Sequence, residues 1–246
     1  DKNQKIYGEE SITYHNNSDD TLKYLWLQLD QNVRARDSKT PDVSTSRVGT
    51  VATEAQFDSK YVSEGFDGGF KIQYVKAADG SDLTHVINST MMRIDLPEPL
   101  ASGGTFQFSI KWWYNINNYV DQGGRSGFEH FEDGNNNYII AQFFPRLCVY
   151  DNVEGWQNKQ FWGRSEFALE FGDYQVNITT PADHVLGATG VLTNPKDVMS
   201  KTQIKRFEKA EKSFTDPVMI VTQEEAEKAE KGFSTKTKTW SFNAKQ

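Results

Sequence analysis

The residues that most often bind metal ions are few and scattered in this chain of 246 residues. The four histidines are His15, His85, His130 and His184. No two of them are close enough in sequence to form a local ligand pair. The chain contains neither an H-E-x-x-H motif nor a twelve-residue calcium-binding loop. On an extended strand, Glu129 would point away from His130. We therefore predict that this chain has no metal site and needs no cofactor.

Covalent catalysis and phosphate binding also lack their usual motifs. The chain has no G-x-S-x-G elbow and no phosphate-binding loop ending in Gly-Lys-Ser/Thr. Its single cysteine, Cys148, lies in the apolar stretch "PRLCVY", which is typical of a buried structural thiol rather than a nucleophile. We therefore predict no catalytic residue in this chain.

The net charge of the chain argues against a nucleic-acid partner, and its lack of a long apolar run argues against a membrane span. Its formal net charge of −7 repels the phosphate backbone of nucleic acids. The most basic stretch, "KTQIKRFEKAEK", interleaves lysines with glutamates, which is typical of a solvated helix face. No run of about 18 apolar residues is present, so we predict no membrane span and no nucleic-acid partner.

An aromatic pair in "KWWYNINNY" offers one alternative function. On a strand, Trp113 faces the side opposite to Trp112, and nearby amides could supply hydrogen bonds to a sugar, from Asn115, Asn117 and Asn118. This pattern supports a free-standing carbohydrate- or protein-binding β-sandwich module. We prefer the interpretation that Trp113 packs against a neighbouring loop or domain.

Alternation of apolar and polar residues dominates the chain and positions all of these side chains. Leu25, Leu27 and Leu29 alternate with Tyr24, Trp26 and Gln28, which we expect on the wetter face of the strand. Phe108, Ile110 and Trp112 alternate with polar residues in a later segment. Similar segments cover 91–97, 166–171 and 174–181, and Gly- and Asp-rich turns separate them. Such a pattern predicts a mainly β fold in which antiparallel sheets pack as a sandwich.

Two short helices are predicted near the C-terminal end. Ser200 with Gln203, and Thr222 with Glu225, match capping boxes, and Gly232 could end the second helix. The segment "DPVMIV" between them is read as a short strand, and the polar tract 33–57 as a long loop. We assign residues 1–246 to a single β-sandwich domain with a helical insertion at about 200–232.

The segment 141–163, "AQFFPRLCVYDNVEGWQNKQFWG", contains six aromatic residues. These are more aromatics than one pair of strands can bury on one face, and an exposed apolar patch normally marks a partner surface. If Phe143 and Phe144 alternate, one enters the core and the other faces a partner. We predict a domain interface formed by Phe143, Phe144, Arg146 and Trp156.

Three stretches carry a resemblance to a known family. They are "YIIAQFFPRL", "VYDNVEGWQNKQF" and "EFALEFGDYQVNITTPADHVLGATG", and "YHNNSDDTLKYLWLQLDQN" and "TKTWSFNAKQ" extend the similarity towards both ends. Together they resemble the N-terminal domain of zinc metallopeptidases of the aminopeptidase N type, in the bacterial branch. The block 141–190 is its most specific part.

The resemblance implies a saddle-shaped antiparallel β-sandwich followed by a thermolysin-like catalytic domain beyond residue 246. That domain would hold the zinc and act on a peptide substrate, whereas this chain would pack against it, shape the cleft and perform no catalysis alone. The chain begins "DKNQ", without Met, and we expect a processed product exported to the periplasm or cell surface.

The resemblance also implies one substrate-binding residue. In the family, Gln or Glu side chains after the corresponding strand fix the free amino end of the substrate, and Gln142 matches the first of these positions. Two residues further on, where many members carry Glu or Gln, this chain has Phe144, which cannot accept a hydrogen bond. Gln142 alone is therefore assigned to substrate binding.

Overall fold

The computed structural model describes residues 3–43, 51, 53–54, 65–163 and 168–245. The chain divides into two compact units, Asp1–Glu170 and Phe171–Gln246, and each is described on its own. The assignment of one domain to residues 1–246 stays a prediction, since two compact units can belong to one domain.

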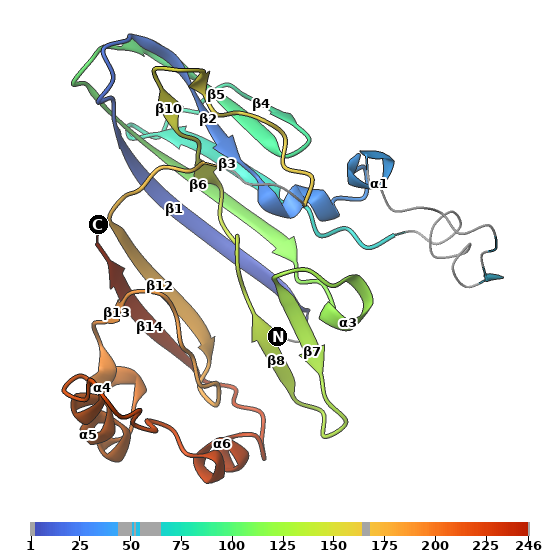
Figure 1. Ribbon diagram of the computed structural model, residues 1–246, viewed down its shortest axis with the longest axis vertical. Helices are drawn as coiled ribbons and strands as arrows, with labels where there is room; N and C mark the ends of the chain where they lie inside the picture. The colour runs from blue at the N-terminus through green and yellow to red at the C-terminus, as the bar shows by residue number, and fades with distance from the viewer. Residues whose placement is uncertain (1–2, 44–50, 52, 55–64, 164–167, 246) are drawn as a thin grey trace. The chain divides into compact units, whose positions relative to one another are not determined.

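The first sheet of unit 1 consists of three antiparallel strands. Its order is β1 (Lys5–His15), β6 (Thr105–Asn115) and β3 (Lys71–Ala77). Figure 1 shows β1 and β6 as long neighbouring strands, and their register runs without a break from Lys5↔Asn115 to His15↔Thr105. The alternation along β6 buries Phe108, Ile110 and Trp112, as the sequence predicts.

The second sheet of unit 1 supplies the other half of the core. Its order is β4 (His85–Asn88), β5 (Met91–Leu100), β2 (Leu22–Gln28) and β9 (Arg146–Leu147). Leu25 and Leu27 of β2 and Ile94 of β5 are fully buried, in one cluster with Phe108 and Ile110 of the first sheet. Each such side chain contributes about 1.5–3 kcal/mol to folding. The prediction of a mainly β fold of antiparallel sheets, packed as a sandwich in unit 1, is confirmed.

Short elements connect the two sheets of unit 1. They are η1 (Asp30–Arg34), α1 (Thr40–Val43), α3 (Tyr119–Gln122) and the hairpins β7 (Gly127–His130) with β8 (Asn136–Ile139) and β10 (Tyr150–Asp151) with β11 (Gly155–Trp156). Much of the predicted loop 33–57 lies outside the described residues. Its described start contains the end of η1 and all of α1.

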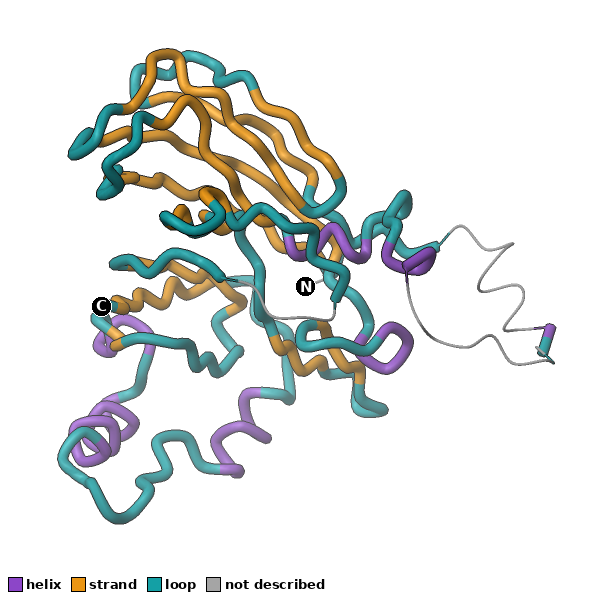
Figure 2. Tube along the Cα trace, turned by 45° about the horizontal axis from the view of Figure 1, so that its top comes forward, coloured by secondary structure: helices purple, strands orange, loops and turns teal. Residues whose placement is uncertain are grey.

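Unit 2 is a three-stranded antiparallel sheet with helices. Its order is β12 (Tyr174–Pro181), β14 (Thr237–Ala244) and β13 (Val191–Leu192). The helices α4 (Pro195–Val198), α5 (Lys201–Ala210) and α6 (Gln223–Ala229), purple in Figure 2, follow β13 along the chain. The core of the unit contains Leu192, Val198, Trp240 and Phe242. Both predicted capping boxes are present, so the prediction of two short helices is confirmed.

Three local predictions differ from the structure. The segment 216–221 forms no strand, and Pro217 cannot donate a ladder hydrogen bond there. In the predicted strand 166–171, Leu169 makes only an isolated bridge to Cys148, and Phe167 lies outside the described residues. Helix α6 ends at Ala229, before Gly232.

Glu10 is the exception on the core-facing side of β1. It lies opposite the fully buried Ile110, and its buried Oε1 has no hydrogen-bond partner among the residues described. Burial raises the pKa of this carboxyl well above its ordinary value, because the charged form loses its hydration without gaining a partner. The neutral acid is therefore the form that the folded unit favours.

We expect the Glu10→Gln variant to be more stable than the parent chain at pH 8, and to gain less or nothing at pH 4. The folded state of the parent binds the Glu10 proton more tightly than the unfolded state does. Its stability therefore falls as the pH rises from the ordinary carboxyl pKa towards the raised one, whereas the amide does not titrate. Urea unfolding at pH 4 and pH 8 tests this.

The control is Glu98→Gln, which changes an exposed carboxyl on β5. An equal stability change at both pH values for Glu10→Gln would contradict the prediction.

Candidate functional site

The segment that carries Gln142 is a loop between β8 and β9, and the side chain of Gln31 forms hydrogen bonds with its backbone. Gln142 has a φ of +54°, in the left-handed region that residues other than glycine rarely adopt. The Nε2 group of Gln31 donates to the carbonyl oxygens of both Ala141, at 3.1 Å, and Gln142, at 3.0 Å. Such a conformation costs about 1–3 kcal/mol and persists only where the surroundings enforce it.

A buried carboxylate lies at the centre of this site. Asp30 is 1% exposed, and its Oδ2 accepts hydrogen bonds from Nε of Arg146 at 2.9 Å and from Nη2 at 2.7 Å. Its Oδ1 accepts from Nε2 of Gln28 at 2.5 Å and from Nε2 of Gln142 at 3.5 Å. The ion pair and the two amides together satisfy a charge that would otherwise be costly to bury.

The contact with Asp30 determines which way the Gln142 amide points. A carboxylate only accepts hydrogen bonds, so the NH₂ group of Gln142 must face Asp30. The carbonyl Oε1 of Gln142 has no hydrogen-bond partner among the described residues. The site therefore presents an oriented acceptor to a donor such as an ammonium group.

Phe143 and Phe144 pack together instead of pointing to opposite sides. Their rings form an edge-to-face pair with centroids 5.0 Å apart, and both are half-buried against the core of unit 1. Neither residue lies in a strand, so the expected alternation does not occur. The carbonyl of Phe143 accepts from the Trp112 indole at 3.1 Å, and Gly8 leaves room for that indole, because a Cβ there would overlap it.

Trp156 lies in β11 and is also half-buried against the core of unit 1. Its ring centroid is 5.2 Å from that of Tyr150 and 6.2 Å from that of Tyr14. In the turn between β10 and β11, the exposed apolar side chain is Val153. A domain interface formed by Phe143, Phe144, Arg146 and Trp156 stays a prediction.

The amides that could accompany Trp113 in sugar binding are engaged within the protein. Asn115 donates to the Asp67 carbonyl at 2.8 Å, and Asn118 accepts from the backbone at the start of α3. Asn117 is buried and donates to the Gly123 carbonyl. The Nζ of Lys5 lies 4.1 Å from the centroid of the Trp113 ring. This arrangement gives little support to a carbohydrate site here.

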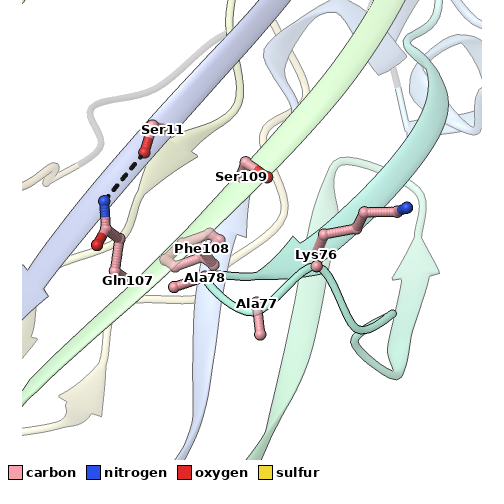
Figure 3. A pocket seen from close by; sticks show the side chains of 8 residues that line it. Ser11, Lys76, Ala77, Ala78, Gln107, Phe108 and Ser109 are labelled. Carbon is pink, nitrogen blue, oxygen red and sulfur yellow. Dashed lines mark hydrogen bonds between the residues drawn. The ribbon is translucent and has the colours of Figure 1, made fainter.

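A shallow pocket of 280 Å³ lies on the face of the first sheet opposite to the core. Figure 3 shows Ser11 and Gln107 on neighbouring strands, joined by a hydrogen bond, and Lys76 extending away from them. In this hydrogen bond, Nε2 of Gln107 donates to Oγ of Ser11 at 3.5 Å. The Lys76 ammonium lies 4.0 Å from Asp82. The pocket therefore brings together no nucleophile, base or pair of charged groups aimed at one point.

Within the described part of the chain, no three His, Cys, Asp or Glu side chains gather in a way that could hold a metal ion. Over the same residues, no helix is long and apolar enough to cross a membrane. Cys148 is fully buried, which confirms the predicted structural thiol. Burial, followed by the charge of Asp30, raises the pKa of this thiol to about 12, so it stays protonated at neutral pH.

Asp30 and Gln31 are the residues of the site that the sequence did not single out. They lie in the polar run "DQN", one residue after the end of the Leu-rich strand β2. That abrupt change from apolar to polar residues is the feature that could have identified them. Gln28, predicted to lie on the wetter face of its strand, is buried because its amide donates to Asp30.

Comparison with known proteins gives similarity in solved structures only. No family model matches the chain, and no curated protein matches it either. A mutant M1 zinc metallopeptidase from Deinococcus radiodurans matches with a TM-score of 0.41 and 12% identity over 97% of this chain and 34% of that one. A second structure of an M1 zinc metallopeptidase from Deinococcus radiodurans matches with a TM-score of 0.39 and 12% identity, over 96% of this chain and 34% of that one.

A two-domain mutant M1 zinc metallopeptidase bound to L-tryptophan gives a TM-score of 0.40 and 12% identity, over 98% of this chain and 35% of that chain. These similarities concern the fold alone. The chain spans about a third of the length of the structures that it matches.

We expect Arg146→Met to lower the free energy of unfolding by about 3–5 kcal/mol, because the Asp30 carboxylate would stay buried without its partner. Adding Asp30→Asn to Arg146→Met should recover part of the loss. Guanidinium unfolding of the 246-residue chain measures both changes.

The matched control is Lys159→Met, which breaks a more exposed ion pair with Glu154. It should cost no more than about 1 kcal/mol. Equal losses for Arg146→Met and Lys159→Met would show that the Asp30–Arg146 pair does not hold the segment.

Proposed function

We propose that this chain is the non-catalytic N-terminal domain of a zinc metallo-aminopeptidase, which shapes the substrate cleft and packs on a thermolysin-like catalytic domain. The resemblance of the sequence block 141–190 to that family supports the proposal. The zinc and the bond cleavage would belong to the catalytic domain of the parent protein, and the substrate would be a peptide.

The observation that carries the proposal is the construction around Gln142. Its backbone is held in a left-handed conformation, its NH₂ group is fixed by Asp30, and its Oε1 is left as an acceptor. Such a group suits the free ammonium end of a peptide, which can only donate hydrogen bonds. Phe144, where a second acceptor would be expected, is packed edge-to-face on Phe143.

The partner of the domain would be its own catalytic domain, against which Phe143, Phe144, Arg146 and Trp156 would form the interface. The guanidinium of Arg146 donates to Asp30. Arg146 would therefore position the neighbouring residues of the interface and contribute less to direct contact with the partner. Val153, which is 85% exposed, extends the apolar surface at the β10–β11 turn. We also propose export of the parent protein to the periplasm or cell surface.

In the parent protein with its catalytic domain, we expect Gln142→Ala to raise KM for peptides with a free amino end by about tenfold or more, the effect of losing a hydrogen bond to a charged group. Steady-state kinetics measure this. Gln122→Ala, at an exposed position of α3, is the control.

An unchanged KM in Gln142→Ala would remove Gln142 from substrate binding.

The 246-residue chain alone should bind no zinc and cleave no aminoacyl or peptide substrate, because the catalytic groups would lie in the other domain. Metal analysis of the purified chain and a peptidase assay with and without a chelator measure this. Zinc-dependent hydrolysis by the chain alone would refute the proposed role. Saturable oligosaccharide binding that Trp113→Ala abolishes would favour the alternative of a free-standing binding module.

A further inference from the structure

A half-buried cation without a counter-ion lies next to the Gln142 segment. Arg34 ends η1, and its Nη1 donates to Oε1 of Gln31 at 3.2 Å. No carboxylate among the described residues forms an ion pair with it. Burial lowers the pKa of the guanidinium from its ordinary value, while the neighbouring Tyr114 opposes this shift. A desolvated charge of this kind normally has a partner.

Asp30 and Asp67 are both engaged by other cations. Asp30 is bound by Arg146, and Asp67 accepts hydrogen bonds from the Lys71 ammonium at 2.7 and 2.8 Å. The positive charge of Arg34 is therefore not neutralised by either of them. In a chain with a net charge of −7, such a local cation is a specific place for an anionic group.

The hydroxyl of Tyr114 is a second polar group without a partner among the residues described. Tyr114 is 1% exposed, and its oxygen forms no hydrogen bond with any residue that the structure describes. The charge of Tyr114 would raise the pKa of Arg34, and the charge of Arg34 would lower the pKa of Tyr114. A guanidinium group only donates hydrogen bonds and a neutral phenol can donate one, so each could donate to an acceptor that a ligand supplies.

Two glycines allow the chain to close around Arg34. A Cβ at Gly124 would overlap Nη2 of Arg34, and one at Gly68 would lie 3.0 Å from its Cβ. The amide of Gly68 donates to the Arg34 carbonyl at 2.8 Å. The Arg34 side chain thus lies against the backbone of two separate segments, with its guanidinium at Gly124 and its Cβ at Gly68.

One amide connects this cation to the acceptor at Gln142. The Oε1 of Gln31 accepts from Arg34, and the Nε2 of the same side chain donates to the carbonyls of Ala141 and Gln142. The Gln31 side chain therefore contacts both the Arg34 guanidinium, which would bind an anion, and the segment that carries Gln142, whose Oε1 would accept from a donor. A ligand that carries both an ammonium group and a carboxylate matches the two.

We propose that Arg34 is a specificity-determining residue that binds the side-chain carboxylate of a peptide whose first residue is acidic, while Gln142 binds the amino end of the same residue. The planar guanidinium matches a carboxylate in a two-pronged hydrogen-bonded pair. This inference rests on the proposed function, because it gives the substrate class of the same site.

The test is titration of the 246-residue chain with Glu-Ala-Ala, Gln-Ala-Ala and N-acetyl-Glu-Ala-Ala, followed by NMR chemical shifts. The first peptide should bind about tenfold or more tightly than the second, since only it can form the charged pair with Arg34. Acetylation should weaken binding by removing the ammonium group that contacts Gln142.

Arg34→Met should abolish the preference for Glu-Ala-Ala over Gln-Ala-Ala, and Arg34→Lys should restore it in part. Arg125→Met, at an exposed arginine of the neighbouring loop, makes the same charge change and should leave the preference intact. Thermal unfolding shows that each variant is folded. If the Arg34→Met chain does not fold, the preference is compared between the parent chain and Arg34→Lys.

Equal binding of Glu-Ala-Ala and Gln-Ala-Ala by the folded parent chain would overturn the inference, as would a preference that survives in Arg34→Met. Either result would leave the proposed function to be decided separately by the KM of Gln142→Ala in the parent protein.

Discussion

The buried ion pair between Asp30 and Arg146 is the contact on which the site depends. Asp30 follows the end of β2, and Arg146 begins β9, which pairs with β2 through Gln28↔Arg146 and Leu27↔Leu147. The charge pair and the strand pair therefore reinforce each other at one edge of the second sheet. A buried carboxylate tolerates little displacement of its donors, because each lost hydrogen bond leaves part of its charge uncompensated. This is why a segment without regular structure can hold Gln142 in one conformation.

The same segment satisfies its backbone without belonging to a sheet. Three successive carbonyls, of Ala141, Gln142 and Phe143, accept hydrogen bonds from side chains, and the donors are Gln31 and the Trp112 indole. Side-chain donors replace the ladder that a strand would supply, as the cost of unpaired backbone groups requires. The two donors come from η1 and from the core-facing side of β6, so both parts of the sandwich contribute to the position of the segment.

Local patterns predicted the sandwich well and the site less well. The alternation along β6 and the capping boxes at Ser200 and Thr222 depend only on residues that are close in sequence, and the structure contains them. The pairing of Asp30 with Arg146 spans 116 positions, and no local period encodes it. For the same reason Gln28 was placed on the wetter face: alternation records which side a residue faces but not the partner that buries it.

The polar groups inside unit 1 separate into two kinds. Asp30 and Asn32 each make several hydrogen bonds that join distant segments, so the fold itself explains their burial. Arg34 makes one side-chain hydrogen bond, to Gln31, and the buried Tyr114 hydroxyl makes none with the described residues. Apolar side chains at these two positions would make the folded state more stable, because a buried polar group that loses its hydration gains no hydrogen bond in exchange. A ligand bound at Arg34, as proposed above, would supply an acceptor for the guanidinium, and Gln31 connects Arg34 to the segment that carries Gln142.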